Sequence, residues 1–565
     1  MSSSPSTSRI RFLSLCVVFV ALFIIGRLYV LQVMEHDTYI EKADRQYARS
    51  GTSIFNRGSI FFTSREGEEV SAATLKTGFT LAVNPQILKN PEGVFAQLST
   101  LLPLEKTDFL QKATKANDPY EEVAKRVDFQ VGEQISKLAV PGVSVYKDRW
   151  RFYPGDSLAS HTIGFLGFKG DDLAGRYGLE SFYETTLKRS EGTYVNFFAQ
   201  IFSNIEKASV DSGEGDIVTS IEPTVQSYLQ NLVNDVNKKY SSEYTGAIVV
   251  DPKTGVIYAM ALSPGFDLNN TKAETDIKVF SNPLVENVYE MGSIIKPLTV
   301  ATGIDTGKIT ADTTYYDGGF VTVNNKKISN FDGKERGMTT MQTALSESLN
   351  VGMAYIVGKV GNDIFSDYMY KFGLDEKTGV DLPNEAKNLV SNLKSPRDIE
   401  HVTASFGQGI ALSPMSTVRA LSTIANGGYV VHPHVVTKIK YKIGITKDVA
   451  YAPGEQVIKK ATAEEVTRMM VRSVDEYLRQ GKMKLPNYSV AVKTGTAQIA
   501  VGGKYSENDF LHSFVGFFPA YSPRFLVFMY TVKPRGVQYG SESLSDPFFD
   551  ITKFLINYYE IPPDR

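Results

Sequence analysis

Three short motifs in this chain combine residue types that suit nucleophilic acyl transfer. Such chemistry needs a nucleophile, a group that takes its proton, and donors for the developing oxyanion. One known solution places Ser-x-x-Lys, Ser-x-Asn and Lys-Thr-Gly in that order along the chain. Each motif alone is weak evidence, because the sequence holds several copies of each. The copies of Ser-x-x-Lys begin at Ser144, Ser293 and Ser391, those of Ser-x-Asn at Ser348 and Ser506, and those of Lys-Thr-Gly at Lys76, Lys253, Lys377 and Lys493.

The surroundings of Ser293 predict a helix start. Gly292 precedes the serine, an apolar run follows it, and Pro297 is tolerated only in a first helical turn. We therefore expect a helix that begins at Ser293, with Lys296 on the same face. The positive helix end would favour negative charge on the serine oxygen and disfavour the ammonium form of a buried lysine. A neutral Lys296 would then accept the serine proton. The alternative, a helix-capping serine with a solvated lysine, stays open for this motif taken alone and suits the other two copies.

Lys493 follows a strand-like run, residues 488–492, and continues as Thr494-Gly495-Thr496. Gly495 would leave room for a ligand backbone along the strand edge. We expect Lys493 and Thr494 to hold a substrate carboxylate and the Thr496 amide to donate to an oxyanion. The other three Lys-Thr-Gly copies are interpreted as turns or strand ends.

Ser348 and Asn350 lie in residues 341–357, whose pattern predicts one continuous helix. Buried serine and asparagine side chains need hydrogen-bond partners, and an active site would supply them. The copy at Ser506 comes after Lys493 and breaks the motif order. One ordered set remains, consisting of Ser293 and Lys296, Ser348 and Asn350, and Lys493, Thr494 and Gly495.

Two hairpins and the helices between them would position this set. Residues 246–260 predict a hairpin around a Pro/Gly turn at 251–255, and residues 513–532 predict a second one. An amphipathic helix is expected over residues 225–240. Hairpins at both ends with helices between them indicate an antiparallel sheet covered by helices, an α+β domain. The region before about Gly215 is strand-rich and irregular.

Composition excludes several other classes of protein. The 565 residues include 60 basic and 62 acidic ones, a net charge of −2, which argues against a nucleic-acid protein that works through bulk charge. The single cysteine, Cys16, rules out a disulfide framework and a cysteine-based metal site. His432 and His434 form the only close histidine pair, and we expect an ordinary surface strand there. No metal or cofactor is predicted.

The N-terminal region predicts a membrane anchor. Residues 12–34 are mostly apolar, and as a helix of about 34 Å they would cross a hydrocarbon core of about 30 Å. Arg9 and Arg11 place residues 1–11 in the cytoplasm and the rest of the chain outside. A cleaved signal peptide, the alternative, predicts a shorter apolar stretch. Arg27 interrupts the span, so its side chain either reaches the head groups or faces a partner in the membrane.

With its motifs in this order, the chain resembles the class B penicillin-binding proteins, which are membrane-anchored peptidoglycan D,D-transpeptidases. The resemblance implies an anchor at 12–34, a pedestal like the penicillin-binding protein dimerisation domain at 35–215, and a transpeptidase domain at 216–565. Further segments carry the resemblance, namely residues 57–60, 151–154 with His161, 178–180, 246–260, 289–297, 344–354, 405–414, 424–431 and 490–498.

The resemblance also implies roles for the candidate residues. Ser293 would be the acylated nucleophile and Lys296 its base, while Ser348 and Asn350 would position the proton relay and the donor peptide. Lys493 and Thr494 would hold the terminal carboxylate, and the amides of Ser293 and Thr496 would form the oxyanion hole. The donor would be a stem peptide ending in D-Ala-D-Ala, an amine on a neighbouring stem peptide would be the acceptor, and β-lactams would acylate the same serine.

The resemblance further implies a polytopic glycan polymerase and division proteins as partners, through the membrane helix and the pedestal. Asn350 and the chain length favour a division role over elongation. Two departures from the family pattern are Leu349, where a small residue is common, and the run after Ile60, which lacks the usual Asp-Arg-Asn-Gly type of sequence.

Three related functions remain as alternatives. A serine β-lactamase shares the motifs but needs a deacylating base, and no Glu-x-x-Leu-Asn-like segment lies between Ser348 and Lys493. A D,D-carboxypeptidase would use water as the acceptor with the same residues. A β-lactam sensor or division scaffold would keep the fold with little turnover.

Overall fold

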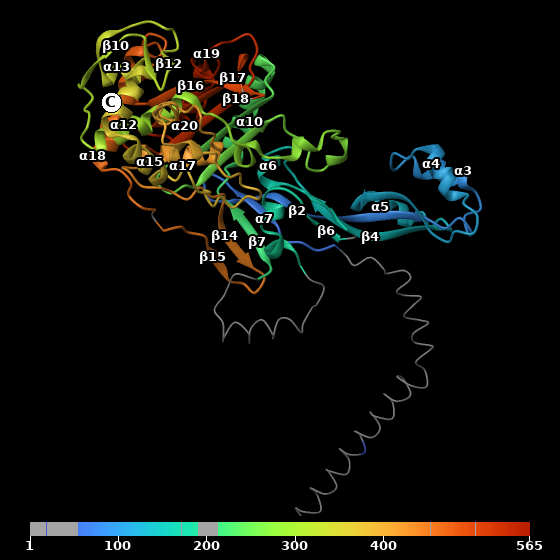
Figure 1. The fold of residues 1–565 in the computed structure, drawn as a ribbon. Helices are drawn as coiled ribbons and strands as arrows, with labels where there is room; N and C mark the ends of the chain where they lie inside the picture. The colour runs from blue at the N-terminus through green and yellow to red at the C-terminus, as the bar shows by residue number, and fades with distance from the viewer. Residues whose placement is uncertain (1–18, 20–54, 171, 190–212, 453, 503) are drawn as a thin grey trace, which may run out of the picture. The chain divides into compact units, whose positions relative to one another are not determined.

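The computed structural model describes residues 19, 55–170, 172–189, 213–452, 454–502 and 504–565 (Figure 1). Two compact units are present, one built mainly from residues 77–150 and the other from residues 56–76, 151–189 and 213–565. The predicted cytoplasmic segment and the span at 12–34 lie outside the described residues, apart from Phe19. No helix among the described residues combines the length and the apolar character needed to cross a membrane.

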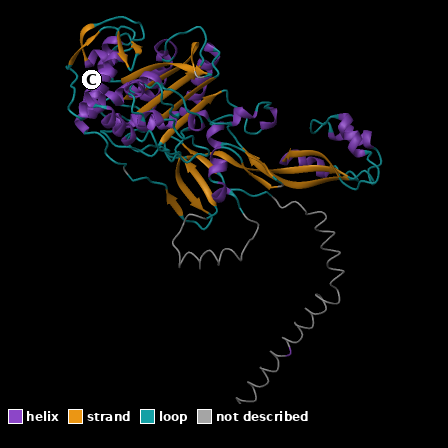
Figure 2. Cartoon of the chain, in the orientation of Figure 1, coloured by secondary structure: helices purple, strands orange, loops and turns teal. Residues whose placement is uncertain are grey.

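A five-stranded antiparallel sheet organises the larger unit. Its strand order is β16-β17-β18-β8-β9, so β16 lies at one edge. Both predicted hairpins belong to this one sheet, which confirms the α+β prediction (Figure 2). The strands are β8 (Tyr244–Val250), β9 (Ile257–Ser263), β16 (Ala491–Val501), β17 (Lys504–Phe518) and β18 (Phe525–Val532).

Helices cover both faces of this sheet. Ile248 and Val250 are buried in one core, whereas Ala247 and Val249 are buried in the other, as the two-residue period of a strand requires. Helices α10 (Pro223–Tyr240) and α20 (Ser545–Tyr558) pack on one face, and α12 (Lys296–Asp305), α17 (Pro414–Ala425) and α18 (Lys460–Arg472) belong to the other core. A sheet packed on both faces is a stiff support for an edge-strand site.

The predicted helix at 225–240 is confirmed, and it begins two residues earlier than expected. Pro223 occupies its first turn, and the Glu222 carboxylate accepts a hydrogen bond from the Val225 amide at 2.6 Å. This side-chain cap satisfies one of the donors that a helix start leaves open. The helix presents Leu229 and Val233 to the core beneath it.

A second sheet of the same unit joins segments that are far apart in the sequence. Strand β1 (Ile60–Thr63) pairs in parallel with β7 (Gly215–Thr219), and β7 pairs antiparallel with β14 (Val436–Tyr441). Strand β15 (Thr446–Asp448) extends this sheet beyond β14. The first part of β2 (Glu69–Val83) pairs antiparallel with β1.

A buried ion cluster lies beside β1. The Glu180 carboxylate accepts from Nε of Arg57 at 2.6 Å and from Nε of Arg151 at 2.6 Å, and the Tyr153 hydroxyl donates to it at 3.2 Å. Arg57 also donates to Glu184 at 2.7 Å. Removing one partner of such a cluster leaves an uncompensated buried charge and typically costs about 3–5 kcal/mol. These residues therefore hold segments 57–60, 151–154 and 178–184 together.

The smaller unit has a core of its own. The second part of β2 pairs with β3 (Glu121–Asp128), and β4 (Val143–Phe152) also pairs with β2. Helices α3 (Pro91–Leu98), α4 (Lys106–Ala113) and α5 (Phe129–Lys137) complete this unit. Ser144 lies inside β4, so it is not the helix-capping serine that the alternative interpretation suggested.

Shorter elements connect these parts. The short strands are β5 (Leu166–Lys169), β6 (Asp172–Gly175), β10 (Thr314–Asp317), β11 (Phe320–Val323), β12 (Lys326–Ser329) and β13 (Gly337–Thr340). The remaining α-helices are α6 (Ser160–Ile163), α7 (Gly178–Phe182), α8 (Glu184–Leu187), α11 (Pro283–Glu286), α13 (Met341–Ser346), α14 (Asn350–Val360), α15 (Asn362–Lys371), α16 (Asp398–Ala404) and α19 (Gly540–Ser543). The other helical turns are η3 (Thr271–Ala273), η4 (Ile277–Phe280), η5 (Gly292–Ile295), η6 (Ser391–Lys394) and η7 (Ser473–Tyr477).

Candidate active site

Ser293 lies in the tight turn that leads into α12. The helical conformation starts at Gly292 as the 3₁₀ turn η5, and α12 proper begins at Lys296 with Pro297 in its first turn. The predicted position of the proline is confirmed. The predicted α-helical start at Ser293 is three residues too early, because the first turn is 3₁₀. Gly292 has a φ of +64°, a conformation that favours glycine.

Lys296 is entirely buried beneath the site, with 0% exposure. Its Nζ donates to the Ser348 carbonyl at 2.5 Å and to the Ser348 hydroxyl at 3.1 Å. Burial, and next the charge of Lys493, hold the pKa of Lys296 well below its ordinary value. This shift favours the neutral amine, whose lone pair can accept a proton.

Ser348 breaks the helix that the sequence pattern predicted as continuous. Helix α13 ends at Ser346 and α14 begins at Asn350, so the prediction of one helix over 341–357 is wrong. Ser348 has a φ of +59°, a left-handed conformation that is costly for a residue with a Cβ. Leu349 is fully buried and fixes this connection in the core. Local strain of this kind concentrates at functional sites.

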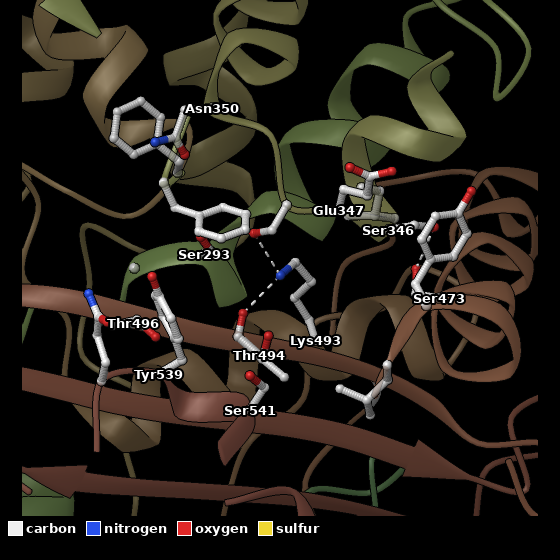
Figure 3. Close-up of a pocket in the computed structure, with 18 of the residues that line it drawn as sticks. Ser293, Ser346, Glu347, Asn350, Ser473, Lys493, Thr494, Thr496, Tyr539 and Ser541 are labelled. Atoms are coloured by element: carbon white, nitrogen blue, oxygen red, sulfur yellow. Dashed lines mark hydrogen bonds between the residues drawn. The ribbon is translucent and has the colours of Figure 1, made fainter. Parts of the chain in front are cut away.

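Lys493 approaches the same hydroxyl from the edge strand β16. Its Nζ donates to the Ser348 hydroxyl at 3.0 Å and to the Thr494 carbonyl at 2.8 Å (Figure 3). Burial lowers the pKa of Lys493 to about 7. Two amines share one hydroxyl, and the charge of Lys493 adds to burial in lowering the pKa of Lys296. The arrangement favours the neutral form of Lys296, and a protonated Lys493 could hold an anion.

The remaining predicted site residues lie around these amines. Asn350 donates from Nδ2 to the Ser329 carbonyl at 2.8 Å, and the Thr496 hydroxyl accepts from the Gly540 amide at 2.9 Å. A Cβ on Gly495 would lie 2.2 Å from the Ser513 hydroxyl. A side chain at position 495 is thus excluded by close packing within the protein. The sequence had suggested another reason for this glycine, namely room for a ligand.

A cleft of about 750 Å³ brings the three motifs together. Ser293 of η5, Asn350 of α14 and the three β16 residues Lys493, Thr494 and Thr496 face the cleft in Figure 3. Ser348 also lines it, whereas Lys296 and Gly495 are buried and lie outside the lining. An amine base, a hydroxyl relay and a cationic side chain beside a serine suit acyl transfer to and from that serine.

The cleft also contains residues that the sequence did not indicate. The Ser346 and Ser473 hydroxyls lie 3.0 Å apart on one wall. The rings of Phe331 and Tyr539 meet edge to face with centroids 5.9 Å apart, and both line the cleft. Ser346 ends α13, Ser473 begins η7, and Phe331 and Tyr539 lie in connections, so no common sequence signal marks these residues.

The segment before Ser293 is held by hydrogen bonds to residues 407–412. Tyr289 and Leu412 exchange two backbone hydrogen bonds at 2.9 and 2.8 Å, and the Gly292 amide donates to the Gly407 carbonyl at 3.1 Å. The Glu290 carboxylate accepts from the Gly409 amide at 3.0 Å and from the Tyr505 hydroxyl at 3.0 Å. Glu290 therefore links the nucleophile turn to two other segments at the rim of the cleft.

Replacing Glu290 by alanine is expected to slow acylation by about 10- to 100-fold, because hydrogen bonds to a charged group contribute about 1.5–3 kcal/mol. The measurement is the acylation rate with a fluorescent penicillin, next to the melting temperature. Tyr505→Phe is the matched control, since it removes one hydroxyl and leaves the Gly409 contact, and we expect a smaller loss. An unchanged rate in Glu290→Ala would show that the turn does not depend on this carboxylate.

The pH profile of acylation should be bell-shaped. Lys296 becomes active as it loses its proton, at a pH well below the usual range for a lysine, and Lys493 loses its charge as the pH rises through about 7. The second-order rate constant for a β-lactam with a carboxylate should therefore fall above about pH 7. In Lys493→Arg the cation persists at all accessible pH values, so the descending limb should move to higher pH. A profile that is flat between pH 6 and 9 in the unmodified protein would contradict this assignment.

The serines and lysines that begin the other motif copies do not line the cleft. Ser391 starts the 3₁₀ turn η6, Lys253 lies in the β8–β9 turn, and Lys377 lies in a loop, as the turn interpretation predicted. Lys76 lies inside β2 and contacts the Phe152 ring. His434 is buried, so the prediction of a surface strand is wrong for it. No group of three metal-binding side chains gathers among the described residues.

Comparison with known proteins places this fold and site in a family. The sequence pattern of the penicillin binding protein transpeptidase domain matches residues 245–552, and that of the penicillin-binding protein dimerisation domain matches residues 56–197. The chain belongs to the penicillin-binding proteins that carry a transpeptidase domain. The resemblance predicted from the motifs is confirmed.

Relatives extend the match to nearly the whole chain. Stage V sporulation protein D of Bacillus subtilis is 28% identical over 96% of this chain and 84% of its own length. The peptidoglycan D,D-transpeptidase FtsI of Escherichia coli is 25% identical over 97% of this chain and 91% of its own length. The structure of penicillin binding protein 2X from Streptococcus thermophilus matches with a TM-score of 0.73 at 19% identity, covering 90% of this chain and 81% of that one.

Proposed function

We propose that the protein is a peptidoglycan D,D-transpeptidase that cross-links stem peptides through a serine acyl-enzyme and is acylated by β-lactams at the same serine. The observation that carries the proposal is the buried Lys296 amine bound to Ser348, which lines the same cleft as Ser293. The similarity to a protein named peptidoglycan D,D-transpeptidase supports the same activity.

In the proposed acylation, Ser293 attacks the carbonyl between the two D-Ala residues as Lys296 takes its proton. The Ser293 and Thr496 amides stabilise the oxyanion, and the proton passes through the Ser348 hydroxyl to the departing D-Ala amine. Lys493 and Thr494 hold the terminal carboxylate, and Asn350 positions the donor peptide. An amine of a second stem peptide then attacks the ester, and Ser293 recovers its proton.

The proposed setting is the bacterial cell membrane during division. The similarity to FtsI over nearly the whole chain supports a division role over an elongation role. We propose an uncleaved anchor at 12–34, a pedestal at 35–215 and an extracytoplasmic transpeptidase domain at 216–565. The anchor and the pedestal would bind a polytopic glycan polymerase and division proteins, and Arg27 is the candidate contact within the membrane.

The test is cross-linking by the full-length protein in detergent. Purified chain is given uncross-linked glycan strands with pentapeptide stems, and the products are digested and resolved by mass spectrometry. We expect dimeric muropeptides with release of D-Ala, both lost after treatment with penicillin. Release of D-Ala without dimers would identify a carboxypeptidase, and labelling by penicillin without either product would identify a sensor. A fluorescent fusion at midcell supports the division role, and one along the sidewall contradicts it.

A further inference from the structure

The larger unit contains a second cleft of about 760 Å³, nearly the volume of the catalytic cleft. Its walls come from the β8–β9 turn, the C-terminal end of α17, the exposed side of α18 and the β17–β18 turn. Helices α17 and α18, which contact each other, are both labelled in Figure 1. The two clefts share no lining residue, so the second one is not an extension of the first.

Two tyrosines give this cleft its accessible aromatic surface. Tyr429 is 41% exposed and Tyr521 is 59% exposed, and both line the cleft. The apolar residues Ile424, Ala463 and Ala520 also line it but are buried behind the surface. Exposed tyrosine rings present a flat apolar face together with a polar hydroxyl. Such faces stack on the C–H groups of pyranose rings.

The rim of the cleft is polar and partly prearranged. Asn426 donates from Nδ2 to the carbonyls of Pro252 and Tyr429 at 2.9 and 2.7 Å, and its Oδ1 accepts from the Tyr429 amide at 2.8 Å. These bonds fix the backbone that carries one of the two rings, which reduces the entropy lost on binding. The exposed polar side chains of the rim are Lys253, Gln456, Lys460, Glu464 and Ser522. Amide, carboxylate, ammonium and hydroxyl groups match the hydroxyl and N-acetyl groups of an amino sugar.

One helical stretch connects the two clefts. Arg468 on α18 lines the second cleft, and Ser473, where η7 continues α18, lines the catalytic cleft. Five helical residues rise about 7–8 Å along the axis. Arg468 and Ser473 are also about 140° apart around the helix axis, so a polymer with a peptide branch in the catalytic cleft would pass around this helix to reach the second cleft.

We propose that the second cleft binds the N-acetylated glycan strand of the substrate, with Tyr429 and Tyr521 as stacking platforms. The inference rests on the proposed function for the identity of the polymer, but binding of sugar is measurable without any catalysis. The concave shape favours a chain-like ligand over a flat protein surface.

Binding is tested with a soluble N-acetylglucosamine tetrasaccharide and the full-length protein in detergent, by saturation-transfer NMR and calorimetry. We expect Tyr521→Ala and Tyr429→Ala to weaken the affinity at least tenfold and Tyr521→Phe, which keeps the ring, to stay within about twofold of the parent. Tyr316→Ala removes a ring that is 65% exposed outside both clefts and should change nothing. Absent binding, or equal binding in Tyr521→Ala, overturns the proposal.

A second measurement separates this inference from the proposed activity. Penicillin labelling should be equal in all these variants, because the substituted residues Tyr316, Tyr429 and Tyr521 do not line the catalytic cleft. Cross-linking of polymeric strands should fall several-fold in Tyr521→Ala, whereas turnover of a free pentapeptide should not. Loss of cross-linking in every variant and in the parent would reject the proposed function while leaving the sugar affinities as an independent result. Preferential binding of the free pentapeptide to this cleft would overturn the glycan assignment.

Discussion

Ser293→Ala is expected to abolish covalent labelling by a fluorescent penicillin while the protein stays folded. The serine lies in the 3₁₀ turn that leads into α12 and lines the cleft, and the pKa of the buried Lys296 is well below its ordinary value. Alanine retains the Cβ and the helical turn, so only the nucleophile is lost. The measurement is in-gel fluorescence after incubation with the penicillin, together with the melting temperature.

Ser391→Ala is the matched control for this change, since it alters another serine of the same motif type outside the cleft. Its labelling should equal that of the parent protein. Persistent labelling of Ser293→Ala would reject the nucleophile assignment, and the two remaining Ser-x-x-Lys sites would then be tested in the same way.

Lys296→Met should reduce the acylation rate by about 10²–10⁴-fold, the usual effect of losing a general base. Methionine fills much of the volume of this fully buried side chain, whereas Lys296→Ala would also open a cavity. Lys493 keeps its contact with the Ser348 hydroxyl in either variant, so the relay is not removed. The measurement is the acylation rate over a range of β-lactam concentrations.

Lys493→Ala serves as the comparison, because it leaves the base in place and removes the carboxylate-binding cation. We expect it to raise the concentration needed for half-maximal acylation more than it lowers the limiting rate. Acylation of Lys296→Met at the parent rate would show that another group takes the serine proton, and Lys493 would then be the next candidate.

The motifs could be predicted because their chemistry is local in sequence. Pro297 marks the start of a helix whatever its tertiary surroundings. The strand before Lys493 was predicted too early, at 488–492, because β16 runs from Ala491 to Val501 and includes Lys493. The left-handed conformation of Ser348 could not be predicted, since the apolar spacing around Leu345 and Leu349 continues the helical pattern. Tertiary packing overrides that local pattern and separates α13 from α14.

The contacts around the motifs could not be predicted from the sequence either. The Glu290 carboxylate is satisfied by Gly409 and Tyr505, which lie more than one hundred residues further along the chain. The strands before about Gly215 were predicted without their pairing partners. Strand β7, for example, pairs with β14, which lies more than two hundred residues further along the chain, and no local sequence pattern predicts that pairing. Long-range pairing of this kind depends on the whole fold.

The pairing of β7 with both β1 and β14 limits how the protein can be shortened for inhibitor screening or crystallisation. A fragment that starts at residue 216 would lose β1, the parallel partner of β7, together with the whole Glu180 cluster. The freed edge would present unpaired amide and carbonyl groups next to apolar side chains such as Ile217, a typical route to edge-to-edge aggregation. A soluble secreted fragment should therefore begin before Arg57, even when only the penicillin-reactive domain is wanted.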